Sequence, residues 1–222
     1  MDLSERPAAT MKLVGGRLFL DFINTSGGRR PDPSQRKAHS GSVIILGEKL
    51  TDYFDLLAWG RHTDSISEAD LQTLMRDARR HEGEASSVLE RAFALREAGY
   101  RICMAILGKR PPEDGDLEIL NREITIARCH ERLSAASDGY VWEWTSEGAA
   151  LDRMLWPVAR SGAELLTTAD LTRIHACGAE DCGWLFEDSS RNRSRHWCTM
   201  QDCGNVAKVR RFRTRVRGTG KA

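Results

Sequence analysis

Hydrophobic residues recur at helical spacing through most of the first 168 positions of the chain. The longest of these apolar stripes predict amphipathic helices over residues 52–62, 68–80, 85–107, 114–128 and 148–167. Thr51 and Ser67 are the expected N-caps of the first two helices, and Pro157 is expected to bend the last one. The pattern therefore predicts a domain built mainly from helices.

Shorter apolar stretches predict the remaining elements. The apolar positions within residues 11–24 favour a short helix over a strand. Residues 43–46 predict a short buried strand, and residues 140–144, which alternate and are rich in aromatic side chains, predict a second strand. Residues 26–42 are rich in Gly, Pro, Arg and Ser and predict a long exposed loop.

Four of the cysteines are concentrated near the C-terminus. They form two close pairs, Cys177 with Cys182 and Cys198 with Cys203, and fifteen residues separate the pairs. Two close pairs of thiolates are the usual donor set of a tetrahedral structural zinc site. The sequence therefore predicts that these four sulfurs bind Zn²⁺.

The spacing alone leaves alternatives to this zinc site open. The four thiols could be unligated or include a redox pair, and His175 or His196 could replace one cysteine as a ligand. The other two cysteines, Cys103 and Cys129, lie in apolar helical stretches and are expected to be buried as small hydrophobic side chains.

The chain thus divides into two predicted domains. An α-rich domain spans residues 11–168 and a zinc module spans residues 171–217, with flexible termini over 1–10 and 218–222. The expected fold class is α+β: a mostly α-helical N-terminal domain with a few short strands, followed by a small four-cysteine zinc finger with a basic helix.

The formal net charge of +1 conceals a strong asymmetry. Residues 171–222 contain 11 Lys and Arg against 5 Asp and Glu, a net charge of +6, so the other residues together carry −5. This polarity indicates an anionic partner for the C-terminal end alone. The sequence shows neither a long apolar run nor an apolar N-terminal signal, so we expect a cytoplasmic protein without membrane contact, whose thiols stay reduced.

The basic residues lie on a predicted helix after Cys203 and on the loop before Cys198, a pattern typical of nucleic-acid binders. The candidate DNA contacts are Arg191, Arg193, Arg195, Lys208, Arg210, Arg211, Arg213, Arg215 and Arg217. The apolar positions of the same helix are expected to pack it on the zinc module; they are Val206, Val209, Phe212 and Val216. A solvated tail, or a helix docked on the acidic N-terminal domain, is the alternative.

The N-terminal domain carries none of the common catalytic or nucleotide-binding motifs, so we expect that the protein is not an enzyme. Asp21, Asn24, Arg96 and Asn121 are the polar residues that the apolar pattern places nearest the core. They predict either an internal hydrogen-bond network or the wall of a small-molecule pocket. In such a pocket Arg96 would clamp a carboxylate or a phosphate.

Specific motifs relate both parts to known families. The segment CGAEDCGWLFEDSSRNRSRHWCTMQDCGNVAKVRRFR resembles the CGNR zinc finger, and the resemblance extends over about 173–217. GGRLFLDFINT, ALREAGYRI and LNREI, which begin at Gly15, Ala94 and Leu120, resemble motifs of the ABATE domain. One departure is Val206, which stands where the CGNR signature has its last arginine. If that arginine touches DNA in the family, this chain lacks one contact.

The resemblance implies a bacterial transcription regulator of the stress response. Its zinc finger would bind duplex DNA, and its N-terminal domain would sense a small-molecule ligand or mediate assembly, including homo-oligomerisation. The alternative function is an RNA-binding or protein-interaction adaptor that uses the same basic zinc module.

Overall fold

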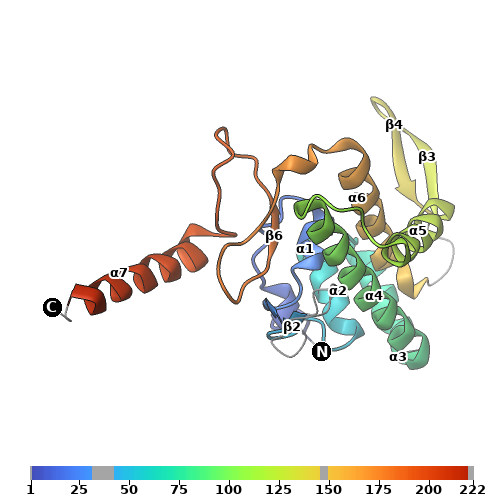
Figure 1. Ribbon diagram of the computed structural model, residues 1–222. Helices are drawn as coiled ribbons and strands as arrows, with labels where there is room; N and C mark the ends of the chain where they lie inside the picture. Colours follow the sequence, from blue (N-terminus) through green and yellow to red (C-terminus); the bar gives the residue numbers. More distant parts are fainter. Residues whose placement is uncertain (1, 32–42, 146–149, 220–222) are drawn as a thin grey trace.

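The computed structural model describes residues 2–31, 43–145 and 150–219, and Figure 1 shows a helical body from which a C-terminal helix projects. The helices of the body are α1 (Leu18–Ile23), α2 (Tyr53–His62), α3 (Glu68–Arg80), α4 (Glu82–Leu107), α5 (Asp114–Cys129) and α6 (Leu155–Thr168). The strands are β1 (Arg29–Pro31), β2 (Val43–Ile45), β3 (Glu131–Ala136), β4 (Gly139–Trp144), β5 (Ile174–Ala176) and β6 (Leu185–Glu187). Single turns of 3-10 helix cover Pro7–Ala9, Leu151–Met154 and Leu171–Arg173, and a π-helical turn, η5 (Met200–Gly204), leads into α7 (Asn205–Thr219). The predicted α+β class is confirmed.

The caps of α2 and α3 show one corrected and one confirmed prediction. Asp52, and not Thr51, is the N-cap of α2, because its side chain accepts a hydrogen bond from the Asp55 amide. Thr51 instead donates its hydroxyl to the Asp55 carboxylate at 2.5 Å. Ser67 caps α3 as expected and accepts from the Asp70 amide.

Two other boundaries differ from the apolar pattern for physical reasons. α4 begins three residues before the predicted start, at Glu82, where acidic side chains favour the positive end of the helix dipole. Pro157 is the third residue of α6, where an amide has no acceptor within the helix, so it lies in the first turn and not at an interior bend. Residues 148 and 149 lie outside the described residues, but Leu151–Met154 form a 3-10 turn and α6 begins only at Leu155, so the predicted early start of this helix is wrong.

The described strands pair as three separate antiparallel hairpins, β1 with β2, β3 with β4, and β5 with β6. β1 corrects the prediction of a continuous loop over 26–42, of which 32–42 lie outside the described residues. β2 is a strand as expected, but it is not buried, since Ile44 is 37% exposed. The strand predicted over 140–144 is present as β4, whereas its partner β3 was not expected.

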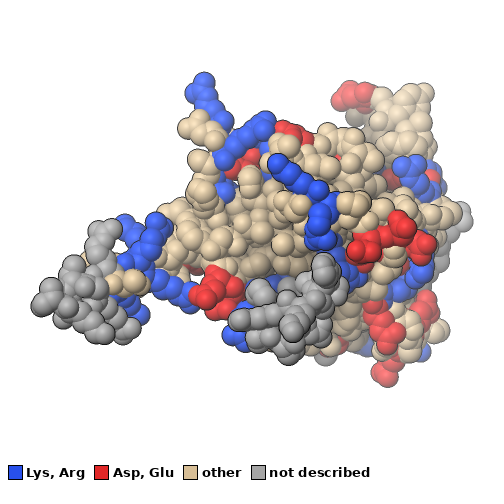
Figure 2. Space-filling model, viewed as in Figure 1, with Lys and Arg blue, Asp and Glu red and all other residues tan. Residues whose placement is uncertain are grey.

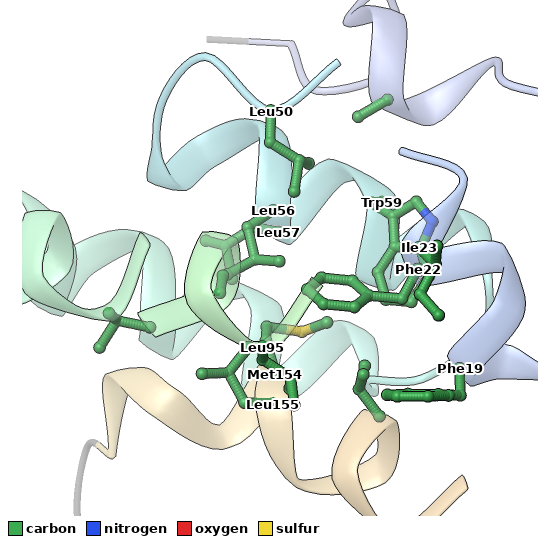
Figure 3. Close-up of a cluster of buried hydrophobic side chains, with 14 of the residues drawn as sticks. Phe19, Phe22, Ile23, Leu50, Leu56, Leu57, Trp59, Leu95, Met154 and Leu155 are labelled. Carbon is green, nitrogen blue, oxygen red and sulfur yellow. The ribbon is translucent and has the colours of Figure 1, made fainter. Parts of the chain in front are cut away.

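The core of the helical body forms around the short helix α1. Its residues Phe19, Phe22 and Ile23 are fully buried and meet side chains from α2, α4 and the start of α6 (Figure 3). Gly99 in α4 and Gly162 in α6 permit this approach, because a Cβ at either position would lie 2.6 Å or 3.0 Å from the Phe19 ring. Packing on several sides therefore holds a helix that is too short to be stable alone.

The zinc module shares this core. Ile174 of β5 and Leu185 of β6 are buried within the same hydrophobic cluster as α1 and α4. The amide of Glu187 donates to the carbonyl of Gly15 at 2.8 Å, and the Trp184 indole donates to the carbonyl of Ser26 at 2.8 Å. The two predicted domains consequently pack as one body.

The N-terminal segment corrects the prediction of a flexible stretch over 1–10. Leu3 and Ala8 are buried, and Arg6 forms ion pairs with Asp52 and Asp55, both at 2.7 Å. These contacts tie residues 2–10 to the start of α2. At the other end α7 continues to Thr219, and the rest of the predicted flexible terminus, 220–222, lies outside the described residues.

The two cysteines outside the zinc module differ in burial. Cys103 is fully buried in α4, as expected, and burial raises the pKa of its thiol to about 12. Cys129 is exposed, so the prediction is wrong there, because the last residue of α5 does not belong to the stripe that this helix buries. No helix in the described part of the chain is long and apolar enough to cross a membrane.

Candidate metal centre and nucleic-acid interface

The four cysteines of the C-terminal module converge on one point. Their Sγ atoms all lie within 4.8 Å of one another, with 3.6 Å between Cys182 and Cys198 and 3.5 Å between Cys198 and Cys203. A tetrahedral zinc with Zn–S bonds of about 2.3 Å needs sulfurs roughly 3.8 Å apart. The donor set and its spacing therefore fit Zn²⁺, as predicted from the sequence.

Local structure explains how each pair is positioned. Cys177 follows β5 directly, and the turn back to β6 carries Cys182 and then Gly183. Gly183 has φ +61°, and a Cβ there would lie 2.7 Å from the Cβ of Arg29, so only glycine suits this position. Cys203 lies in η5, whose first turn is capped by the Thr199 side chain.

Hydrogen bonds already favour a thiolate at Cys177. Its sulfur accepts from the thiols of Cys182 and Cys198 and from backbone amides that include that of Cys198 at 3.3 Å, and these bonds lower the pKa of Cys177. The pKa of Cys182 is raised, because its proton is shared with Cys177 and Cys198 and because it is partly buried. Crowded thiols of this kind release protons when a metal binds.

The histidines do not join the sulfurs. Among the described residues, the one group arranged to hold a metal consists of the four cysteines alone. The His175 ring packs near Phe186, at 5.9 Å between centroids, and His196 is exposed and uses its carbonyl to accept from Gly178 at 3.0 Å. All six cysteines are free of disulfide bonds.

Asp188, which the sequence analysis did not single out, organises the basic loop before Cys198. Its carboxylate accepts from the amides of Ser190 at 2.8 Å and Arg195 at 2.9 Å. Hydrogen bonds from Ser190 and Arg195 lower the pKa of Asp188 to about 2. The signal was present in the sequence, since Asp before two serines is typical of a side chain that closes its own turn.

The three arginines of this loop have different environments. Arg195 directs its guanidinium inward, where it donates to the carbonyls of Val14, Trp197 and Cys198 and lies 4.1 Å from the centre of the Phe186 ring. Arg193 is exposed and pairs with Asp170 at 3.0 Å. Arg191 is exposed. The loop thus presents two of its arginines to solvent and uses the third to hold its own shape.

The helix α7 carries the other basic candidates away from the body (Figure 1). Lys208, Arg210, Arg211 and Arg213 are exposed, and Arg210 pairs with Glu180 at 3.0 Å. The side chains of Arg215 and Arg217 lie outside the description. Figure 2 shows Lys and Arg on α7 and around the module, whereas the acidic side chains on this face gather mainly over the helical body.

The expectation that α7 packs its apolar stripe on the zinc module is wrong. Val206 is 51% exposed, Val209 47% and Phe212 66%, and the side chain of Val216 is not described. The stripe stays uncovered because α7 continues outward from Gly204 and does not turn back over the module. For the same reason its described part does not dock on the acidic N-terminal domain.

Asp21 holds the segment before α1, and Asn24 joins the N-terminal domain to the module. The Asp21 carboxylate accepts hydrogen bonds from the amides of Val14 and Gly15 at 2.8 and 2.7 Å. Burial raises the pKa of Asp21, although these two hydrogen bonds lower it. The Asn24 amide donates to the Leu185 carbonyl and accepts from the Leu185 amide, both at 2.8 Å. Both residues therefore satisfy backbone groups of neighbouring segments.

Arg96 lies at the centre of a buried ion network. Its guanidinium makes two bonds to Glu48, at 2.6 and 2.7 Å, and one to Glu97 at 2.9 Å, and it is 2% exposed. Glu97 also pairs with Arg29, which is buried and whose amide donates to the Cys182 carbonyl at 2.9 Å. Of the two roles predicted for Arg96, the internal network is the one that these contacts form.

Asn121 does not join the other three residues. It is exposed on α5, so the prediction that it lies next to the core is wrong. The buried residues of α5 include Leu120, Glu123 and Ala127, and Asn121 lies at the edge of that stripe, on the solvent side. The four residues predicted to line a ligand pocket therefore do not converge on one site.

The fold and the site define a zinc-finger protein in which a helical domain holds a four-cysteine module and its projecting basic helix. The ABATE family model, described as "Putative stress-induced transcription regulator", matches residues 16–169, and the CGNR zinc finger model matches residues 173–216. The chain belongs to the ABATE family and carries a CGNR zinc finger, as its motifs predicted. A search of curated proteins found no match.

Proposed function

We propose that this protein is a non-enzymatic transcription regulator that binds duplex DNA through α7 and the loop before Cys198. The observation that carries the proposal is that α7 presents Lys208, Arg211 and Arg213 to solvent, clear of the helical body. A single helix fits the major groove, and arginine forms paired hydrogen bonds with phosphates and with guanine edges.

The zinc centre gives this helix a defined direction. Cys203 lies in η5, and η5 passes directly into α7, so the metal-bound turn forms the base of the helix. Arg191 and Arg193 of the loop are proposed as additional phosphate contacts. Arg195 is proposed as a positioning residue, because its guanidinium bonds to the carbonyls of the module.

Val206 changes the chemistry at the start of α7. It is half exposed and lines a groove of about 360 Å³ between the cysteines and the helix, together with Trp184 and Arg210. An arginine at this position would reach solvent on the same side as Arg210. We therefore assign the phosphate contacts of the first two turns of α7 to Lys208 and Arg210.

Substitution of Lys208 and Arg211 by glutamate tests the DNA proposal. We expect the double variant to lose duplex binding by at least about 100-fold, since two phosphate contacts become repulsive. In the wild-type chain, roughly six contacts would give a log–log salt slope of about −5. Fluorescence anisotropy with labelled duplex at several salt concentrations measures both quantities.

The matched control is Arg76→Glu with Arg80→Glu, which changes the same charge on exposed positions of α3. It should retain most of the wild-type affinity. Equal losses in the two variants, or a flat salt response of the wild-type chain, would show that α7 is not the DNA contact. Preference for RNA over duplex in competition would favour the adaptor function.

We propose that the N-terminal domain senses the signal, a small ligand as the family resemblance implies, and that Asn24 transmits it to the module. Asn24→Ala leaves the amide and carbonyl of Leu185 unpaired, so we expect the free energy of unfolding to fall by about 1–3 kcal/mol. We also expect a change in DNA affinity. Urea denaturation and anisotropy measure the two effects, and Asn121→Ala, at an exposed position, is the control for both.

A protein partner is the second candidate, and the exposed stripe on α7 favours it. Val206, Val209 and Phe212 leave apolar surface uncovered among basic side chains, a pattern suited to an acidic amphipathic partner. In that case Phe212→Ser would abolish binding to the partner without changing the salt slope for DNA.

A further inference from the structure

The hairpin formed by β3 and β4 stands away from the helical body (Figure 1). Its strands pair at six successive positions, from Glu131 opposite Trp144 to Ala136 opposite Gly139. The contacts with the body lie at its base, where Trp144 meets Trp156 at 5.9 Å between ring centroids and Glu131 pairs with Arg160 at 2.8 Å. The outer part of the hairpin is therefore without cover among the described residues.

The two faces of the hairpin differ in chemistry. Residues directly opposite each other in an antiparallel pair share a face, so Leu133 lies beside Trp142, and Ala135 beside Tyr140. We call these four residues the aromatic face. Leu133 is 57% exposed, Trp142 58% and Tyr140 75%.

The opposite face carries a pair of charged residues. Arg132 and Glu143 lie on it and pair across the strands at 3.7 Å, and Val141 is 43% exposed there. The aromatic face itself has no side chain that is charged at neutral pH. At the base the same face continues with Glu131, and Trp142 borders a groove that also contains Arg128, Arg160 and Glu164 of α5 and α6. Arg160 pairs there with both Glu131 and Glu164.

An uncovered face of this composition is typical of a protein interface. Tyrosine and tryptophan dominate binding energy at such surfaces, and a two-stranded hairpin is marginal without something packed on it. Because the four residues of the aromatic face are uncharged, this face is poorly suited to nucleic acid and to strongly acidic or basic partners. A second copy of the chain supplies the same apolar face without electrostatic repulsion, in the self-complementary manner of a two-fold dimer.

We propose that two copies of this chain pair through the aromatic faces of their hairpins. At these exposures, the three large side chains present on the order of 400 Å² per chain, so a pair buries about 800 Å² plus the flanking backbone. That area is below the roughly 1,200 Å² at which standard specific interfaces begin, so we expect a weak, reversible dimer. The hairpin and α7 lie at opposite ends of the molecule in Figure 1, so pairing leaves both basic helices free.

Sedimentation equilibrium of the full zinc-loaded chain, from about 1 to 200 µM, tests the proposal. We expect a reversible monomer–dimer equilibrium in the wild-type chain. Leu133→Thr with Tyr140→Thr, both exposed and suited to a strand, should raise the dissociation constant at least about 10-fold. Val141→Thr, on the opposite face of the same hairpin, should leave it unchanged.

Circular dichroism and zinc content check that all three proteins are folded. A wild-type chain that stays monomeric to 200 µM would overturn the proposal and assign the aromatic face to a different partner. Dimerisation that the double variant retains, or that Val141→Thr weakens equally, would also overturn it. Because the measurement involves no DNA, its failure is distinct from failure of the proposed DNA binding.

Discussion

Replacing Cys198 with serine is expected to abolish stoichiometric zinc binding and, with it, binding to DNA. Cys198 is 3% exposed and its sulfur lies within 3.6 Å of two other ligand sulfurs, so no other side chain can take its place. A structural zinc site contributes on the order of 10 kcal/mol to the folding of a small module. Elemental analysis of protein purified in reducing buffer without chelator, with anisotropy on duplex DNA, measures the outcome.

Cys129→Ser is the matched control, because Cys129 is exposed and remote from the cluster in sequence and fold. This variant should retain one zinc ion per chain, and its free energy of unfolding should equal that of the wild-type chain. Removal of zinc from the wild-type chain by a chelator should reproduce the Cys198→Ser phenotype. Zinc retained at one per chain in Cys198→Ser would contradict the four-sulfur site and return His175 or His196 to consideration.

Replacing Arg96 with methionine is expected to lower the free energy of unfolding by about 3–5 kcal/mol. The change leaves Glu48 without its arginine partner and Glu97 paired with Arg29 alone, and breaking a buried ion pair from one side is strongly destabilising. Burial opposes ionisation of Glu97, yet bonds and charges from Arg29 and Arg96 lower its pKa, which shows how strongly it depends on them. Urea denaturation followed by circular dichroism measures the effect.

Arg80→Met is the control for this experiment. Arg80 is 67% exposed and lies 4.0 Å from Asp77, so its loss should cost less than about 1 kcal/mol. If Arg96→Met were as stable as the control, Arg96 would not be needed for the network. Its second predicted role, as a clamp for a carboxylate or phosphate ligand, would then be the better interpretation.

The four zinc ligands could be predicted because the spacing of cysteines that bind one metal ion is a local property of the sequence. Each pair of cysteines lies on one short turn, so four positions in the sequence specify the ligand set without knowledge of the rest of the fold. The helices could be predicted for the same reason, since their signals are local. In α3 these signals are the N-cap Ser67 and the apolar stripe that follows it. The start of α2 moved by one residue because Asp52 made the better cap, and that of α4 moved by three, whereas α6 starts at Leu155 and not at residue 148.

Contacts between distant residues could not be predicted in the same way. Arg96 is 48 residues from Glu48, and its apolar surroundings in the sequence indicate burial without naming the partner. β3 was missed because its ERLSAA sequence lacks the alternation of a strand and depends on pairing with β4. The stripe of α7 was identified correctly, but an apolar stripe does not reveal whether its own chain or another molecule covers it.

The burial of Leu185 among the helices has a consequence for how this architecture can be inherited or engineered. Asn24 and Gly15 bond to the backbone of β6, so a finger transplanted onto another carrier would lose the surface that completes it. We therefore regard the finger as a non-portable module: fusions and chimaeras should exchange it only together with the α1 segment. Substitutions in α1 and β6 are accordingly expected to compensate one another across related chains.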